Sequence, residues 1–336
     1  MKVLASISTK NRYNTTLHMA IQSVISQTRA VDKLVIFDDS DVHEDLRSNP
    51  TYAHLFELMD RKNILWEWVF STRKGQHHNH QMANQMALQH GYECVWRVDD
   101  DCIAEPQVLA NLCFHWSPQV GAVGGSVLTP HWQLSENSTG KITNVNTEPS
   151  IQWGHITQVT QVDHLHCTFM YRAGAWDYNL ALSKVAHREE TLFTWGIKQR
   201  GFQVKVVPHT VTWHLKSNSG GIRSTDSREL YAQDDQIFQN FMNLNDKTIV
   251  ILDCGMGDHV VFKHVLPKLI NPEVFSCYPQ IIPGRSIAEA KSQFGDIDAW
   301  NVYKKMHDWH WKTSLQSAFE KLYGVENTSH AVDSTL

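Results

Sequence analysis

The sequence predicts an α/β fold in which a mainly parallel sheet is flanked by helices. Short apolar runs of strand length alternate with segments of helical spacing through the first half of the chain. Glycine and proline separate these segments, and polar residues follow several of the apolar runs. This alternation is typical of parallel sheets that helices cover on both faces, with ligands at the carboxyl ends of the strands.

The elements of the first half follow from short-range pattern. Strands are expected over 2–8, 33–39, 64–70, 93–101 and 120–128, each a compact apolar run. Helices are expected over 15–27, 44–60 with a break at Pro50, 75–91, and 106–116 with Pro106 in its first turn.

The second half is less regular. Residues 129–161 are polar without a clear period, which favours an irregular insertion. Strands are then expected over 162–172 and, broken at Pro208, over 202–216; helices are expected over 186–201 and 228–243, with a Gly/Ser loop at 217–227.

Two domains are expected, a first over 1–245 and a small α/β or mostly helical module over 246–336. The second begins with a pattern that predicts a strand, a glycine turn and a helix over 248–270. Helical segments are expected from there to about residue 324.

Composition indicates an ordinary soluble protein. Hydrophobic residues make up 42% of the 336 residues, and the net charge of −5 gives no global basic field for nucleic acid. The six cysteines form no CxxC pair, which favours reduced thiols and a cytoplasmic location, or the host cytoplasm if a phage encodes the chain. No apolar run approaches 18 residues, so no stable membrane insertion is expected, and the oligomeric state stays open.

Three consecutive carboxylates, Asp99, Asp100 and Asp101, follow one predicted strand. Crowded carboxylates raise one another's pKa unless a cation compensates, and oxygen ligands suit Mn²⁺ or Mg²⁺. The alternative is a solvated loop that caps the next helix. Strand alternation points Asp100 away from its neighbours, so it is expected to cap that helix or to orient Arg97.

Other strand ends carry groups suited to a base, a ribose and phosphates. They are Thr9, Asn11 and Arg12 after the first strand, Asp38 and Asp39 after the second, and Arg73 and Lys74 after the third.

With these residues in place, the chain resembles the family 2 glycosyltransferases of the GT-A (nucleotide-diphospho-sugar transferase) fold. The T-x-N-R turn, the D-D-S-D strand end, the D-x-D pair and the following E-P match the family in order. An acidic pair, a Gly–Phe, a proline and a histidine then follow, here Glu189, Glu190, Gly201, Phe202, Pro208 and His214. The resemblance covers residues 1 to about 220.

The resemblance implies roles for individual residues. Asp38 should meet the nucleobase with Thr9 and Asp39 nearby, Asp99 the ribose, and Asp101 the metal. His214 lies where some members place a second metal ligand, although a core or surface histidine is the alternative. Glu190, or else Glu189, falls at the position of the catalytic base, where the family usually has Asp.

Two further stretches carry charged or metal-binding residue types. In the loop that begins at Lys216, Lys216 and Arg223 are candidates to neutralise phosphate, with a solvated loop as the alternative. His77 and His80 lack acidic or cysteine neighbours, which favours solvated helix residues over a zinc site.

The function expected is an inverting, metal-dependent glycosyltransferase with Mn²⁺ or Mg²⁺ and a nucleotide-sugar donor, foremost a UDP-sugar. The acceptor would be a hydroxyl of a glycan or, as a lower-ranked option, a hydroxymethylated DNA base. The alternatives are a nucleotidyltransferase acting on a sugar phosphate, whose usual glycine signature is missing after the first strand, and a non-catalytic nucleotide-sugar binder.

Overall fold

The computed structural model describes residues 1–71, 74–129, 141–143, 146–147, 150–216, 220–221 and 228–245, and four strands beyond them. The chain divides into two compact units, Met1–Gln236 and Ile237–Leu336, and each is described by itself. Within the described part of the chain, no helix has the length and apolar character needed to cross a membrane.

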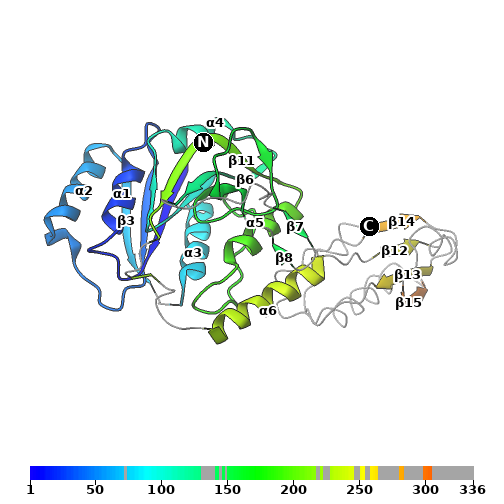
Figure 1. The fold of residues 1–336 in the computed structure, drawn as a ribbon. Coiled ribbons are helices and arrows are strands. Elements are labelled where there is room, and N and C mark those ends of the chain that lie inside the picture. Colours follow the sequence, from blue (N-terminus) through cyan, green and yellow to red (C-terminus); the bar gives the residue numbers. More distant parts are fainter. Residues whose placement is uncertain are drawn as a thin grey trace. The chain divides into compact units, whose positions relative to one another are not determined.

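One large sheet organises the first unit (Figure 1). Its strands are β1 (Val3–Thr9), β2 (Lys33–Asp38), β3 (Leu65–Phe70), β4 (Cys94–Asp99), β5 (Cys102–Ala104), β6 (Val120–Leu128), β9 (Thr160–Gln161), β10 (Phe169–Arg172) and β11 (Gln203–His214). Their order is β3-β2-β1-β4-β10-β6-β11-β5, and β9 pairs with β11. A separate hairpin joins β7 (Ile142–Thr143) to β8 (Asn146–Thr147).

The first half of the sheet is parallel, as predicted. The pairs β2–β3, β1–β2 and β1–β4 are parallel, and so is β6–β11. β10 runs antiparallel to both β4 and β6, while β5 and β9 run antiparallel to β11. The parallel ends of β1, β2 and β4 therefore open at one edge of the sheet.

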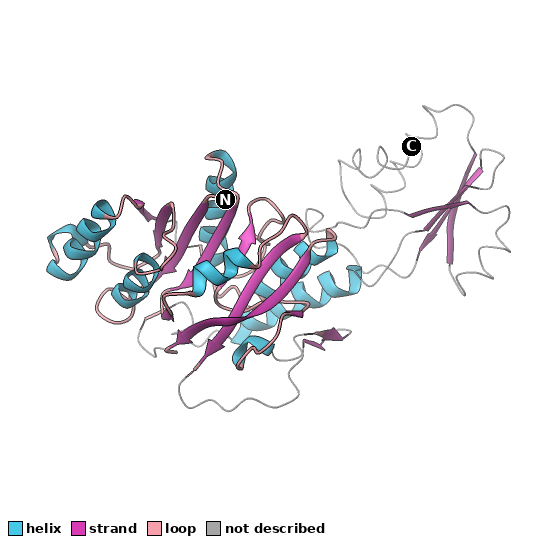
Figure 2. Ribbon diagram, turned by 90° about the horizontal axis from the view of Figure 1, so that it is seen from above, coloured by secondary structure: helices cyan, strands magenta, loops and turns pink. Residues whose placement is uncertain are grey.

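Helices cover both faces of this sheet (Figures 1 and 2). They are α1 (Leu17–Ile25), α2 (Pro50–Arg61), α3 (Gln76–Gln89), α4 (Val108–Phe114) and α5 (Glu189–Gln199), with single turns at Leu46–Ser48 and Ile151–Trp153. A further helix, α6 (Arg228–Asn245), contains the boundary between the two units. The apolar faces of α1, α2 and α4 share one buried cluster with alternate residues of β1, β2 and β4. Alternation along the strands leaves the other face to α3, where Asn79 bonds to Ser8 on β1, and to α5.

Local chemistry explains where two of these helices begin. The side chain of Asn49 accepts from the backbone of Thr51, and Pro50 occupies the first turn of α2, so the predicted break at this proline is a helix start. α3 begins after Gly75, whose φ of +112° favours glycine; a Cβ there would lie 2.8 Å from the carbonyl oxygen of Lys184.

The interpretation of His77 and His80 as solvated residues is wrong. Both face inward from α3 and are at most 1% exposed. Burial, with the nearby His78, lowers the pKa of His77 to about 4. These two imidazoles are therefore neutral packing groups, and only their burial, which a local pattern does not reveal, distinguishes them from surface histidines.

One strand differs from its predicted extent, and another shows its predicted break. Of the expected strand 162–172, only Phe169–Arg172 pairs in the sheet, and Cys167 just before it has a left-handed φ of +54°. β11 loses register with β6 between Val206 and Val211, around Pro208, which has no N–H to donate.

The second unit contains a four-stranded sheet. Its strands are β12 (Val250–Asp253), β13 (Asp258–Lys263), β14 (Gln280–Pro283) and β15 (Asp298–Lys304), in the order β14-β12-β13-β15. The prediction of a helix after the glycine turn is wrong over 258–263, which form β13. The prediction of helical segments to residue 324 is wrong at β14 and β15, which are strands. β13 pairs antiparallel with β12 and β15, and these partners decide its conformation.

Candidate functional site

The predicted donor residues converge because three parallel strands end together. In the sheet register Thr9 of β1 lies beside Asp38 of β2, and Ser8 lies beside Asp99 of β4. The backbone N–H of Asp39 then donates to the carbonyl of Thr9 at 2.9 Å, which closes this edge of the sheet.

Asp100 and Asp101 are held by the turn that follows β1. The Thr9 hydroxyl donates to Asp100 at 2.8 Å, and Arg12 reaches both carboxylates, with Nε 3.4 Å from Asp100 and Nη1 2.9 Å from Asp101. Asp100 thus neither caps α4, whose N-cap is Gln107, nor pairs with Arg97, so both expectations for it are wrong. Burial raises the pKa of Asp100 to about 7, against the charge of Arg12.

His214 is brought to Asp101 by strand pairing. β5 and β11 run antiparallel with His214 opposite Cys102, and Nε2 of His214 lies 3.4 Å from Oδ1 of Asp101. Burial opposes charge on both groups, but other contacts outweigh it. The hydrogen bond to His214 and the charge of Arg12 lower the pKa of Asp101 to about 2. Cys167 and the hydrogen bond to Asp101 raise the pKa of His214 to about 11. One carboxylate oxygen and one imidazole nitrogen at this separation could hold a divalent cation, and the thiol of Cys102 lies within 4.8 Å of both.

Asp38 lies fully buried beneath this edge of the sheet. Its carboxylate accepts from the hydroxyl of Tyr13, from the indole N–H of Trp68 at 3.1 Å and from the backbone N–H of Ser40 at 2.9 Å. These bonds fix the loop after β2. The role of Asp38 toward a nucleobase stays a prediction.

The turn after β1 is tied to the loop after β2. Asn11, with a left-handed φ of +55°, donates its backbone N–H to Ser40 and exchanges side-chain and backbone bonds with Asp41. Gly221 donates to the carbonyl of Lys10 at 2.8 Å, so part of the 217–227 loop region docks on this turn.

The remaining predicted phosphate-binding residues are Lys74, Lys216, Arg73 and Arg223. Lys74 and Lys216 are exposed, and Lys216 has a left-handed φ of +49°. Arg73 and Arg223 lie outside the described residues.

The two glutamates at the start of α5 have different surroundings. Glu189 is buried, accepts from Gln76 at 2.6 Å and lies 3.0 Å from Nη2 of Arg97. The same Arg97 nitrogen lies 3.1 Å from Asp99 and 3.6 Å from Glu190. Burial raises the pKa of Glu189 against the charge of Arg97. Glu189 is therefore a structural partner of Arg97, while Glu190 lies farther from Arg97 and also contacts His166 and Cys167.

Arg97 is the main site residue whose importance sequence reasoning missed. Its side chain is wholly buried, and its guanidinium carbon lies 5.2 Å from the ring centroid of Phe169. The signal was present: an arginine between Trp96 and Val98 in a buried strand requires carboxylate partners. Strand alternation places Arg97 and Asp99 on the same face, toward α5.

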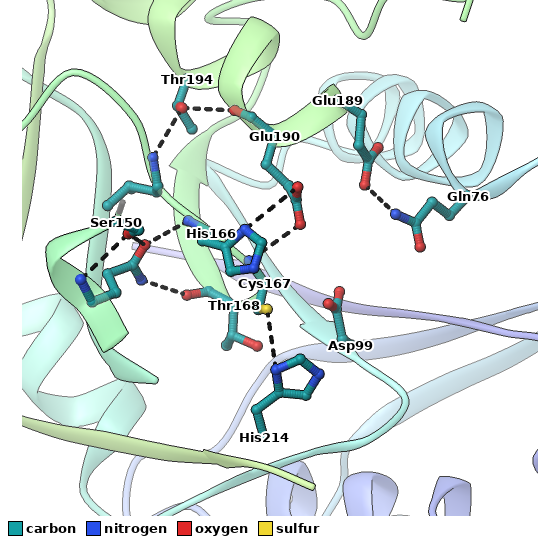
Figure 3. Close-up of polar contacts among 12 residues, drawn as sticks. Gln76, Asp99, Ser150, His166, Cys167, Thr168, Glu189, Glu190, Thr194 and His214 are labelled. Carbon is teal, nitrogen blue, oxygen red and sulfur yellow. Dashed lines mark hydrogen bonds and ion pairs between the residues drawn. The ribbon is translucent and has the colours of Figure 1, made fainter. Parts of the chain in front are cut away.

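Glu190 faces His166 and Cys167 (Figure 3). Its Oε1 accepts from the backbone N–H of Cys167 at 3.2 Å, and its Oε2 lies 3.7 Å from Nδ1 of His166. Burial would lower the pKa of His166, but Cys167 and Glu190 raise it to about 9. The thiol of Cys167 in turn lies 3.6 Å from Nδ1 of His214, so Cys167 stands between Glu190 and the Asp101–His214 pair.

Comparison with known proteins gives similarity in structure alone. No family model and no curated protein sequence matches the chain. The structure of GalNAc-T7 with UDP, GalNAc and Mn²⁺ is similar at a TM-score of 0.52 and 13% identity, over 73% of this chain and 50% of that one.

Two other solved structures are similar at lower scores. One is the mannosyltransferase PcManGT from Pyrobaculum calidifontis with GDP-Man and Mn²⁺ (TM-score 0.43, 15% identity, 73% of this chain and 62% of that one). The other is S. aureus TarS 1-349 (TM-score 0.47, 14% identity, 73% and 65%). The chain thus spans less than two thirds of each. With the strand order described above, the similarity to GalNAc-T7 shows that the first unit has the GT-A fold.

Proposed function

We propose that this chain is a metal-dependent, inverting glycosyltransferase that moves a sugar from a nucleotide-diphosphate donor, foremost a UDP-sugar, to an acceptor hydroxyl. The GT-A fold and the order of the motifs support this proposal. We assign the reaction to residues 1–245, and the module 246–336 to a supporting or acceptor-presenting role.

The donor would bind along the edge where β1, β2 and β4 end. We assign the nucleobase side to Thr9, Asp38 and Asp39, and the ribose to Asp99. The diphosphate would meet cationic and polar groups from the surrounding turns, namely Asn11, Arg12, Arg73, Lys74, Lys216 and Arg223.

The pair Asp101 and His214 would hold Mn²⁺ or Mg²⁺. When bound, such a cation neutralises charge on the leaving diphosphate. Because Nη1 of Arg12 lies 2.9 Å from Asp101, we expect this guanidinium to turn toward the diphosphate when the donor is loaded.

Glu190 is the catalytic base of this proposal. As the acceptor oxygen attacks the anomeric carbon, Glu190 takes the hydroxyl proton, and the bond from that carbon to the diphosphate breaks with its electron pair on the leaving oxygen. A single displacement of this kind inverts the configuration. Glu189 is the weaker candidate, because its bonds to Arg97 and Gln76 hold it in the interior.

The observation that carries the proposal is the placement of Cys167. Its thiol contacts His214 and its backbone N–H binds Glu190, so one residue separates the candidate metal pair from the candidate base. His214, which with Asp101 would hold the cation, and Glu190, which would take the acceptor proton, thus both contact Cys167.

The test is release of nucleoside diphosphate from a panel of nucleotide sugars, with glycan acceptors and with Mn²⁺ or EDTA. We expect Mn²⁺-dependent release with at least one donor and a product of inverted anomeric configuration. Because the net charge of −5 does not attract DNA, we expect DNA acceptors to give less product than glycans. Retained configuration, or turnover that survives EDTA, would overturn the proposal. A nucleotidyltransferase would instead release pyrophosphate from a nucleoside triphosphate.

A further inference from the structure

A second group of metal-ligating side chains lies beside the Asp101–His214 pair. His166, Cys167 and Glu190 each offer one ligand atom, and these three atoms lie within 4.8 Å of one another. Figure 3 shows the imidazole of His166 and the carboxylate of Glu190 turned toward each other, with Cys167 next to both. Nothing in the donor chemistry described above requires a thiol and an imidazole at the base.

The geometry is close to that of a tetrahedral zinc site. With Zn–N and Zn–O bonds of about 2.0–2.2 Å, two such ligand atoms lie about 3.4 Å apart. Nδ1 of His166 and Oε2 of Glu190 are 3.7 Å apart without any ion. A movement of a few tenths of an ångström would bring these two atoms to that separation, and the thiol of Cys167 lies within 4.8 Å of both.

The three ligands are held in place from the backbone. The backbone N–H of His166 donates to Oε1 of Gln152 at 2.5 Å, and its ring packs edge-on against Trp153 with centroids 5.2 Å apart. Cys167 is fixed by its left-handed φ of +54° and by its N–H bond to Oε1 of Glu190. That bond leaves Oε2 directed at His166.

Acids lie on the Arg97 side of the group, and the imidazole of His214 lies beside the thiol of Cys167. Two further carboxylates, Asp99 and Glu189, lie around Arg97 together with Glu190, so a single guanidinium faces three acids. The side chain of His166 is 25% exposed while that of Glu190 is 5% exposed, so an ion would enter from the histidine side and keep an open position there. Thiolate, imidazole and carboxylate together select Zn²⁺ over Mg²⁺.

We propose that His166, Cys167 and Glu190 bind Zn²⁺, or another thiophilic divalent cation, at a site distinct from the Asp101–His214 pair. Occupancy would take the carboxylate of Glu190 and so inhibit transfer, a consequence that rests on the proposed function. The binding itself does not depend on that function.

The direct test is titration of the full-length, metal-free protein with Co²⁺, followed by its absorption spectrum. We expect a thiolate-to-cobalt charge-transfer band with one Co²⁺ bound, displaced by one equivalent of Zn²⁺. Cys167→Ser should remove the band. His166→Gln should weaken Zn²⁺ binding by at least about 100-fold, since even loss of an outer-shell partner of a metal ligand costs 10–100-fold.

Matched variants separate this site from the neighbouring one. Cys113→Ser, on α4, is the thiol control, and Asp101→Ala removes a ligand of the other pair; both should keep the band. Cys102 lies beside Asp101 and His214 and could serve as a ligand at that neighbouring site. A band that is lost in Cys102→Ser and kept in Cys167→Ser would therefore overturn the proposal. Absence of any cobalt band in the wild-type protein would overturn it as well.

Inhibition is measured separately, at saturating Mn²⁺. We expect Zn²⁺ to lower turnover without displacing nucleotide sugar, and Cys113→Ser to be inhibited like the wild type. If Co²⁺ binds through Cys167 but no donor is ever turned over, the metal site stands and the proposed function fails.

Discussion

The end of β4 and the start of α5 each gather acids around one arginine, but the two arginines are held differently. Arg12 comes from a turn, is 7% exposed and contacts Asp100 and Asp101. Arg97 comes from the middle of a strand and is wholly buried against Asp99 and Glu189. A cation on a turn can exchange with a metal or a phosphate, whereas one inside a strand is a fixed part of the fold.

The largest expected effect separates the two acids at the start of α5. Glu190→Gln should lower turnover by about 10²–10⁴-fold, the usual contribution of a general base, while donor binding persists. Glu189→Gln should mainly lower stability, since it weakens a buried pair with Arg97. Turnover and nucleotide-sugar affinity, measured on both variants, check this. Normal turnover in Glu190→Gln would shift the base to Glu189.

The two arginines should differ in whether a bound metal ion can compensate for their loss. Arg97→Met leaves buried carboxylates unpaired and should cost about 3–5 kcal/mol of unfolding free energy. The surface pair Lys33–Glu67 provides a control, and Lys33→Met should cost about 1 kcal/mol or less. Arg12→Met should also destabilise, but Mn²⁺ should restore much of that loss because it neutralises the same carboxylate. Denaturant unfolding of Arg12→Met and Arg97→Met, with and without Mn²⁺, measures this difference. Equal stabilisation of both variants by Mn²⁺ would contradict the distinction between the two arginines.

Asp100 gives the β4 end its own pH dependence. Its pKa is raised to about 7, so between about pH 4 and pH 7 the folded state binds more protons at this group than the unfolded state does. Protonated Asp100 thus adds to the free energy of unfolding at low pH, and this contribution is lost as the pH rises through the window. At 1.36 kcal/mol per pKa unit, the loss is up to about 4 kcal/mol. Asp100→Asn should remove this slope in metal-free unfolding curves. An unchanged slope would mean that Arg12 keeps Asp100 ionised throughout.

The smallest expected effect concerns the loop that docks on the turn carrying Arg12. A Cβ at Gly220 would lie 2.4 Å from the carbonyl oxygen of Asn11, and its φ is +73°. Gly201 has a similar φ of +85° with nothing within 4 Å of such a Cβ. Both alanine variants carry about 1–2 kcal/mol of backbone strain, but only Gly220→Ala should weaken nucleotide-sugar binding. Equal affinities in a binding titration would remove the loop from the donor site.

The first half of the fold was predictable because its signals are local. Period-2 and helical patterns separated by Gly75, Pro50 and Pro106 place strands and helices without knowledge of their partners. β13 was not predictable in this way, because its conformation depends on pairing with β12 and β15. The same holds for residues 162–168, where the expected start of a strand forms a loop with a left-handed Cys167.

Motif order predicts which residues gather at the strand ends, but it does not predict their contacts. The structure places Asp101 and His214 3.4 Å apart, while their role toward a metal stays a prediction. The difference between Glu189 and Glu190 depends on Arg97, which lies 92 residues earlier than Glu189 and which no local pattern connects to it. The neighbours of Glu190 at 166 and 167 come from a segment that was expected to be a strand.

The measurement that tests the central claim most directly is the thermal unfolding of the protein with a panel of nucleotide sugars, with and without Mn²⁺. A ligand at 100 times its Kd stabilises by about 2.7 kcal/mol, enough for a clear shift in Tm. We predict a Mn²⁺-dependent shift with at least one nucleotide sugar, lost in Asp101→Ala and reduced to a smaller extent in Asp100→Ala. No metal-dependent shift with any nucleotide, or an undiminished shift in Asp101→Ala, would contradict the account.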